Sequence, residues 1–226
     1  MVDGVDHDSC LVPVSHTGWH FRYYLVLLVL FPNISVAGQL EAISITETGG
    51  QYEARIVALF DAPAEYVYGV ITDYKHIYRI NPSIVESELL SAQEDGVIRV
   101  RNRIEHCIAI FCLELEMVED VVEVGEGHIV AVTVPELSSF ESGTATWHVR
   151  PFGEGRARVQ YLASIKPDFF IPPVIGSLII KSKLREEITT SFIRIECHAR
   201  IMAKMDIEDK TVSLARRSEE NTGCAG

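Results

Sequence analysis

A long amphipathic segment near the C-terminus is the feature that most constrains the fold of this 226-residue chain. Its apolar residues recur every three or four positions, and charged residues occupy the other faces. This spacing predicts an amphipathic helix of about 30 residues that Pro172-Pro173 opens and that ends near Met205. At about 1.5 Å per residue, such a helix is as long as a whole β-sheet, so it needs an apolar sheet face to cover. The apolar positions are Ile175, Leu178, Ile179, Leu184, Ile188, Phe192, Ile195, Ala199 and Met202.

Short strands with turn residues between them account for most of the chain before this helix. Apolar residues alternate with polar ones over 52–60, and a helical stripe then runs from Pro63 to Asn81-Pro82. The later strands are separated by Asp-Gly and Gly-Glu-Gly turns, and such short connections favour an antiparallel meander. The predicted strands are 52–60, 84–90, 97–106, 111–122, 128–134, 144–150 and 156–165.

This order of elements is similar to that of a known superfamily. The segments VALFDAPAEYVYGVITDYKHIYRINPSIVESELL (57–90) and PDFFIPPVIGSLIIKSKLREE (167–187) resemble the START-related, or SRPBCC, superfamily. That superfamily includes polyketide cyclases, coenzyme Q-binding proteins and the birch-pollen allergen type, and the resemblance covers about residues 50–204. It implies an α+β helix-grip fold, in which a curved seven-stranded antiparallel sheet wraps around the long C-terminal helix, with short helices between strands 1 and 2. It also implies an apolar cavity between sheet and helix, in a fold that supports lipid transfer, cyclisation, hydrolysis and chaperone-like roles.

The N-terminal region has the pattern of an export signal. Arg22 precedes a nine-residue apolar run at 23–31, which is too short to span a bilayer, and Ser35-Val36-Ala37 offers small residues for cleavage before Gly38. This predicts a cleaved signal peptide and a periplasmic or secreted protein; the alternative is a buried strand or an uncleaved anchor. The predicted organisation is a leader and signal peptide at 1–37, a linker at 38–49, a START-like domain at 50–205 and a flexible tail at 206–226.

Alternation within the strands indicates which side chains face the sheet interior. The inner positions are even-numbered over 97–106 and odd-numbered over 111–117, and we expect no carboxylate among them. The inner polar residues are Asn102, His106 and Tyr161, with Ser87 and Thr133 as further candidates. The candidate ligand-binding residues are Asn102, His106, Leu113, Leu115, Met117, Trp147, Tyr161, Phe169, Phe170, Ile179, Ile188 and Phe192.

Several of these assignments have alternatives. His106 is either a hydrogen-bonded structural histidine, a ligand contact or a catalytic group, and no acidic or nucleophilic partner for it is evident. Trp147 and Tyr161 are either core residues or a platform for a ligand. Because the sequence has no phosphate-binding loop, nucleophile elbow or metal-ligand spacing, we expect no catalytic residue, no cofactor and no metal.

The segment Cys107-Ile-Ala-Ile-Phe-Cys112 predicts a tight hairpin. A four-residue connection would place the two cysteines opposite each other, at a separation that a disulfide accepts. We therefore predict a Cys107–Cys112 bridge if the protein is exported, with two inert buried thiols as the alternative. The same register places opposite charges across the strands on the outer face. The predicted pairs are Cys107 with Cys112, His106 with Leu113, Arg103 with Glu116, and Arg99 with Asp120.

The two ends of the meander differ in polarity. The connections at 95–96, 125–127 and 152–155 are polar, whereas those at 108–111 and 166–174, at the opposite end, are mostly apolar. The apolar end is either a cavity mouth that makes transient membrane contact through 108–111 and 169–174, or a plug that closes the core.

Three functions follow from these features. The first is an exported carrier of a hydrophobic small molecule such as a lipid, a quinone or a polyketide-like compound. The second is a cyclase, aromatase or hydrolase that uses His106, Asn102 and Tyr161. The third is a protein-interaction module without a usable cavity. A net charge of −12 argues against a nucleic-acid partner.

Overall fold

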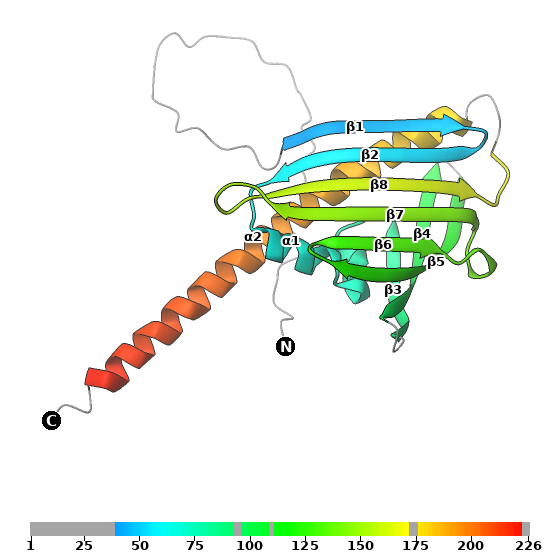
Figure 1. The fold of residues 1–226 in the computed structure, drawn as a ribbon. Helices are drawn as coiled ribbons and strands as arrows, with labels where there is room; N and C mark the ends of the chain where they lie inside the picture. Colours follow the sequence, from blue (N-terminus) through cyan, green and yellow to red (C-terminus); the bar gives the residue numbers. More distant parts are fainter. Residues whose placement is uncertain (1–38, 93–95, 109–110, 172–175, 223–226) are drawn as a thin grey trace, which may run out of the picture.

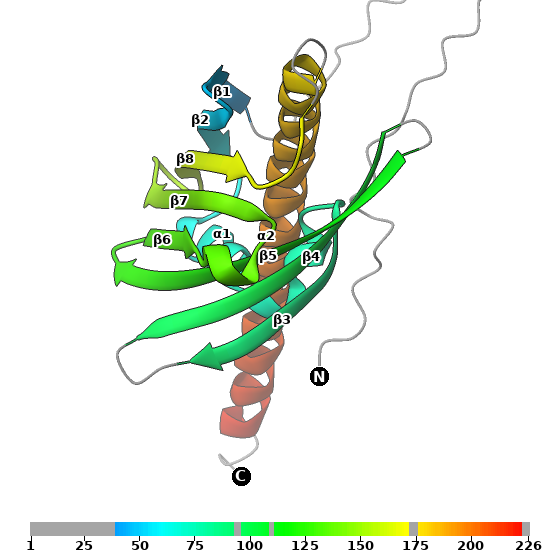
Figure 2. The ribbon, with the colours of Figure 1, turned by 90° about the vertical axis from the view of Figure 1, so that its right-hand side faces the viewer.

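One curved antiparallel sheet and a long helix make up the fold (Figure 1). The structure, a computed structural model, describes residues 39–92, 96–108, 111–171 and 176–222. The sheet has eight strands in the order β1-β2-β8-β7-β6-β5-β4-β3, and it bends around helix α2, as Figure 2 shows. The elements are β1 Gln39–Thr48, β2 Gln51–Phe60, α1 Ala64–Ile71, the 3-10 helix η2 Tyr74–Arg79, β3 Ile84–Ala92, β4 Val97–Ile108, β5 Phe111–Gly125, β6 His128–Thr133, the 3-10 helix η3 Pro135–Leu137, β7 Phe140–Pro151, β8 Ala157–Pro167 and α2 Gly176–Thr222.

This is the predicted α+β helix-grip architecture, with short helices between β2 and β3 as expected. The predicted count of seven strands is wrong, because residues 39–48 of the expected linker 38–49 form the edge strand β1. Ile43 and Ile45 pack against the core from this strand. The hairpin to β2 turns at Gly49 and Gly50, whose φ angles of 61° and 83° suit a tight two-residue turn.

The second difference concerns the C-terminal segment. Residues 206–226 were expected to be a flexible tail, yet α2 continues to Thr222 and projects beyond the sheet (Figure 1). No glycine or proline interrupts residues 206–222. The Lys210 ammonium contacts Asp206 at 2.6 Å one turn earlier, and the Tyr66 hydroxyl of α1 donates to the same carboxylate. The helix therefore extends through 206–222, where no residue breaks it and a contact between side chains one turn apart supports it.

The β4–β5 hairpin has the predicted register, including Cys107 opposite Cys112. The side chain of Cys107 lies outside the described residues, so the disulfide bridge stays a prediction. Forming the bridge would remove two hydrogens, and intact mass measurement with and without reductant detects this loss. Arg99 contacts Asp120 as predicted, through two 2.7 Å hydrogen bonds. Arg103 stands opposite Glu116 as predicted, and its guanidinium contacts carboxylates of β3 and of its own strand, at Glu86 and Glu105.

The core lies where α1 and the middle of α2 meet the sheet. Val67 of α1 and Phe192, Ile195 and Ala199 of α2 are almost fully buried against strand residues such as Ile56. Burying side chains of this size supplies most of the free energy that holds the helix on the sheet. Farther toward the N-terminal end of α2, the helix and the sheet separate.

None of the helices in the described part of the chain is both long and apolar enough to cross a bilayer. The expected signal peptide at 1–37 and the Pro172-Pro173 start of the helix lie outside the described residues.

Candidate functional site: an apolar cavity

A cavity of about 760 Å³ lies between the inner face of the sheet and α2. Its walls come from β2 to β8, from η2 and from the first turns of α2, and they are mostly apolar. Phe170 lines the cavity and is 83% exposed, so the cavity reaches the surface between β8 and α2. A cavity of this size holds a lipid-sized or drug-sized molecule.

The predicted inner-face pattern is confirmed for most of the cavity wall, with Phe140 and Thr144 of β7 as exceptions. Even-numbered residues of β4 and odd-numbered residues of β5, β7 and β8 line the cavity. The side chain of His106 is the one candidate that lies outside the described residues. The candidates that line the cavity are Asn102, Leu113, Leu115, Met117, Trp147, Tyr161, Phe169, Phe170, Ile179, Ile188 and Phe192.

The expectation that no carboxylate faces the interior is wrong. Glu119 of β5 lines the cavity, and its odd number places it on the same face as Met117 and Val121. The sequence around it is Met117-Val118-Glu119-Asp120-Val121, in which apolar residues occupy both faces, so the alternation is weak at this point. Val118 is on the outer face but is buried, because residues 135–139 cover it. The Val118 amide donates to the Ser138 hydroxyl of this segment at 2.9 Å.

Burial beneath the sheet and helix raises the pKa of the Glu119 carboxyl to about 7. Removal from water penalises the charged form of a carboxyl, and a nearby cation would reverse that effect. Burial is also the main reason that the pKa of Tyr161 is raised, and the Glu119 charge adds to it. The two groups are therefore electrostatically coupled inside the same cavity, and near neutral pH Glu119 is present in both protonation states.

Trp147, Tyr161 and Phe192 form an aromatic wall of the cavity. The Trp147 and Tyr161 ring centroids are 4.2 Å apart, and Phe192 stacks on Trp147 at 5.6 Å. These residues therefore pack on one another and line the cavity at the same time; a ligand platform at Trp147 and Tyr161 stays a prediction. Phe60 extends the cluster into the core, with an edge-to-face contact of 5.7 Å to Phe192.

Two tyrosines fasten the short helices beside the cavity. The Tyr68 hydroxyl of α1 donates to Glu123 of β5 at 2.5 Å, and the Tyr74 hydroxyl of η2 donates to the same carboxylate at 3.0 Å. Burial first, and this hydrogen bond second, raise the pKa of Tyr68 to about 12. Tyr74 also lines the cavity, so this contact holds one of its walls in place.

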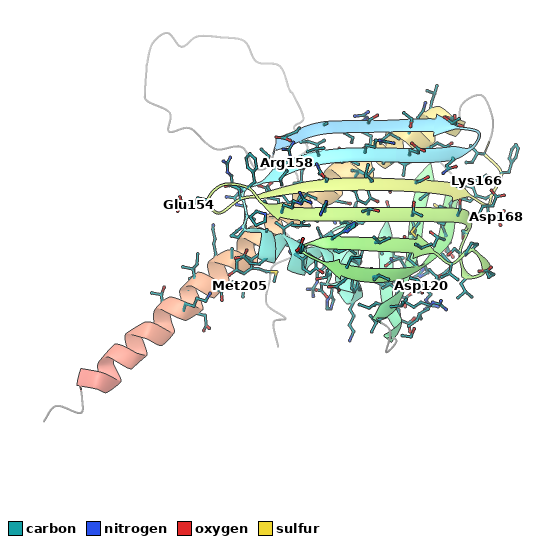
Figure 3. The ribbon with its side chains drawn as sticks, in the orientation of Figure 1. Asp120, Glu154, Arg158, Lys166, Asp168 and Met205 are labelled. Atoms are coloured by element: carbon teal, nitrogen blue, oxygen red, sulfur yellow. The ribbon has the colours of Figure 1, made fainter. Side chains whose placement is uncertain are left out.

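The two ends of the sheet differ as the sequence indicates. Figure 3 places Glu154, in the polar connection between β7 and β8, at the end opposite Lys166 and Asp168. At the latter end, Phe170 and Leu178 are 83% and 64% exposed. Parts of the apolar connections 108–111 and 169–174 lie outside the described residues. No group of three or more histidine, cysteine or acidic side chains in the described part of the chain is arranged to hold a metal ion.

The fold and its cavity define a class of protein, the helix-grip proteins with an internal apolar site. The family model described as "Polyketide cyclase / dehydrase and lipid transport" matches residues 51–199, and the chain belongs to this family. Comparison with curated proteins gave no match.

Solved structures of low sequence identity share the fold. A START superfamily protein from Mycobacterium smegmatis is similar with a TM-score of 0.55 and 16% identity, covering 66% of this chain and 98% of that chain. The Zhui aromatase/cyclase from Streptomyces sp. R1128 has a TM-score of 0.55 and 13% identity, covering 66% and 94%. The STAR-related lipid transfer protein from Xanthomonas axonopodis has a TM-score of 0.51 and 17% identity, covering 70% and 98%.

Proposed function

We propose that this protein binds and carries a hydrophobic small molecule, lipid-like or quinone-like, in the cavity between the sheet and α2. The single observation that carries the proposal is the apolar cavity of about 760 Å³. Its volume is well above the roughly 300 Å³ at which small-molecule sites begin, which argues against an interaction module without a usable cavity. The lipid transport named for the family and the lipid transfer named for the Xanthomonas protein support the same function.

Uptake of a fluorescent fatty acid or prenyl quinone by delipidated protein tests this proposal. Ala163 lines the cavity, so Ala163→Phe should fill part of it and reduce uptake. The matched control is Leu162→Phe, which adds an aromatic ring at the next position of β8, on the outer face where Leu162 is 48% exposed. Circular dichroism should show both variants folded. If Ala163→Phe is folded and uptake is unchanged, or if no apolar probe binds at all, the cavity is not the binding site.

The apolar end of the sheet is proposed as the entrance, which contacts a lipid surface transiently. Phe170 and Leu178 are exposed there, and Leu113 of the β4–β5 hairpin is 39% exposed. Exposed apolar side chains at a cavity opening suit loading from a membrane. Phe170→Asp should therefore slow ligand transfer between vesicles. Phe152→Asp, which changes an exposed phenylalanine near the opposite end, should not. Equal effects of the two substitutions would contradict this entrance.

Export is a further part of the proposal. The apolar run at 23–31 after Arg22 and the small residues Ser35-Val36-Ala37 support a signal peptide cleaved before Gly38, and hence a periplasmic or secreted protein. Native mass spectrometry of protein purified from its source compartment would report cleavage and bound ligand in one measurement. A chain that retains residues 1–37 would contradict cleavage and would leave the cavity proposal intact.

The second candidate is an enzyme of the cyclase or aromatase kind, the activity named for the Zhui structure. One observation favours it: Glu119 and Tyr161 place a carboxyl with a pKa of about 7 and a phenol in one mostly apolar cavity. Such a pair suits proton transfer at neutral pH better than the expected set of His106, Asn102 and Tyr161. Cyclisation of a linear polyketone that Glu119→Gln abolishes would support the enzyme, whereas binding without turnover supports the carrier.

A further inference from the structure

A row of polar side chains crosses the apolar inner face of four neighbouring strands. Ser87 of β3 stands opposite Asn102 of β4, and Glu119 of β5 stands opposite Thr133 of β6. Asn102 pairs with Met117, so Glu119 is its diagonal neighbour, within reach of the same ligand atoms. We call Ser87, Asn102, Glu119 and Thr133 the polar row.

The polar row has hydrogen-bonding capacity that the described residues leave unused. The Asn102 Oδ1, the Ser87 Oγ and the Thr133 Oγ1 atoms are buried and have no hydrogen-bond partner within the described ranges. Asn102 and Thr133 are each only 5% exposed, and Asn102 lines the cavity. Buried polar atoms are nearly always paired, so three such atoms in one row indicate a missing partner.

The neighbouring strand β7 packs closely against the Thr133 end of the row. A Cβ atom at Gly143 of β7 would lie 2.2 Å from the Thr133 Oγ1 atom. The Thr133 hydroxyl therefore packs directly against the β7 backbone, and glycine at position 143 makes room for it. Lys183 is a cation that lines the cavity, and its ammonium contacts Glu186 at 2.8 Å on α2.

We propose that the polar row binds the uncharged hydroxyl head of an otherwise hydrophobic ligand, such as a long-chain alcohol, a sterol-like alcohol or a quinol, with the apolar part directed toward Phe170. A ligand hydroxyl can donate to Asn102 Oδ1 and accept from the Ser87 hydroxyl directly opposite, so it satisfies both groups. An alkane supplies neither hydrogen bond, and a quinone or an ester only accepts. An ionised fatty acid would bring a second negative charge next to Glu119. This inference rests on the proposed carrier function.

A chain-matched set of ligands tests the inference. Displacement of a fluorescent apolar probe is measured for hexadecanol, methyl palmitate and palmitate, at a pH where the fatty acid is ionised. We expect hexadecanol to bind about tenfold or more tightly than either other ligand, because each of the others leaves a buried polar atom unpaired or adds a charge. Asn102→Leu should remove this preference. Ile104→Leu, at the next inward position of β4, should keep it.

The outcomes separate the inference from the carrier function. If the three ligands bind equally well, or if Asn102→Leu leaves the preference unchanged while the variant is folded, the head-group assignment is overturned and the carrier function stands. If Asn102→Leu fails to fold, Ser87→Ala, which removes the hydroxyl directly opposite Asn102, replaces it with the same expectation. If none of the ligands displaces the probe, the inference fails, and if the probe itself does not bind, the carrier function fails with it.

Discussion

Replacing Glu119 by glutamine should remove a pH-dependent loss of stability. Burial raises the pKa of this carboxyl from 4.5 to about 7 in the folded protein. Between these pH values the folded state holds a proton that the unfolded state has released. The free energy of unfolding of the wild type therefore falls as pH rises through this window, and it stays lower above it. A pKa difference of this size corresponds to about 3 kcal/mol.

Urea denaturation at a series of pH values between about 4 and 9 measures this effect. Glutamine carries no charge at any of these pH values, so Glu119→Gln should gain stability relative to the wild type as pH rises. The gain should reach about 3 kcal/mol at the alkaline end and be smallest near pH 4.5. Glu114→Gln, at an exposed outer position of the same strand, corrects for the loss of one negative charge from an acidic protein. A difference between Glu119→Gln and wild type that is constant over pH, or that shrinks as pH rises, would refute a buried carboxyl that faces the cavity.

Two further predictions concern packing and a buried hydrogen bond. Gly143→Ala should destabilise the fold by about 1–3 kcal/mol, because its Cβ would clash with Thr133. Gly69→Ala, in the middle of α1 with ordinary contacts only, should stabilise it by about 0.5–1 kcal/mol, and equal signs for the two substitutions would contradict the close approach. Glu196→Ala should lower the free energy of unfolding by about 1–3 kcal/mol, because the buried Glu196 carboxylate accepts a 2.8 Å hydrogen bond from the Asp61 amide. Urea midpoints measure all three, and a neutral Glu196→Ala would show that water replaces that contact.

The sequence predicts those parts of the fold that depend on local patterns, such as the alternation of apolar residues in a strand and the length of a short connection. The β4–β5 register follows from a short connection and from charge pairing, as between Arg99 and Asp120, so it needs no knowledge of distant residues. Strand β1 escaped prediction although Gly49-Gly50 is a strong hairpin signal, because only Ile43 and Ile45 mark its apolar face. The extension of α2 to Thr222 was not predicted, because the apolar periodicity ends near Met205 while the helix continues with mostly polar residues.

The site was less predictable because it depends on tertiary contacts. Glu119 has the parity of an inner residue. Val118 beside it is also buried, under residues 135–139, so apolar residues occur on both faces and their alternation does not identify the inner face. The cavity itself has no signature in the sequence. The same apolar residues would fill a packed core if α2 lay closer to the sheet, and the curvature of the sheet decides the distance.

Without ligand, the polar row should lower the free energy of unfolding of the protein. An unpaired buried Asn102 Oδ1 and a charged Glu119 are unfavourable for folding, and leucine at position 102 would remove one of these terms while adding apolar contact. Asn102→Leu should therefore be at least as stable as the wild type without ligand, and it should also lose the preference for hydroxyl ligands. If Asn102 served packing alone, its replacement would instead lower the free energy of unfolding and weaken the binding of all ligands alike. Comparing the thermal unfolding of the two proteins with and without hexadecanol decides between these roles: the ligand should raise the midpoint of the wild type more than that of Asn102→Leu.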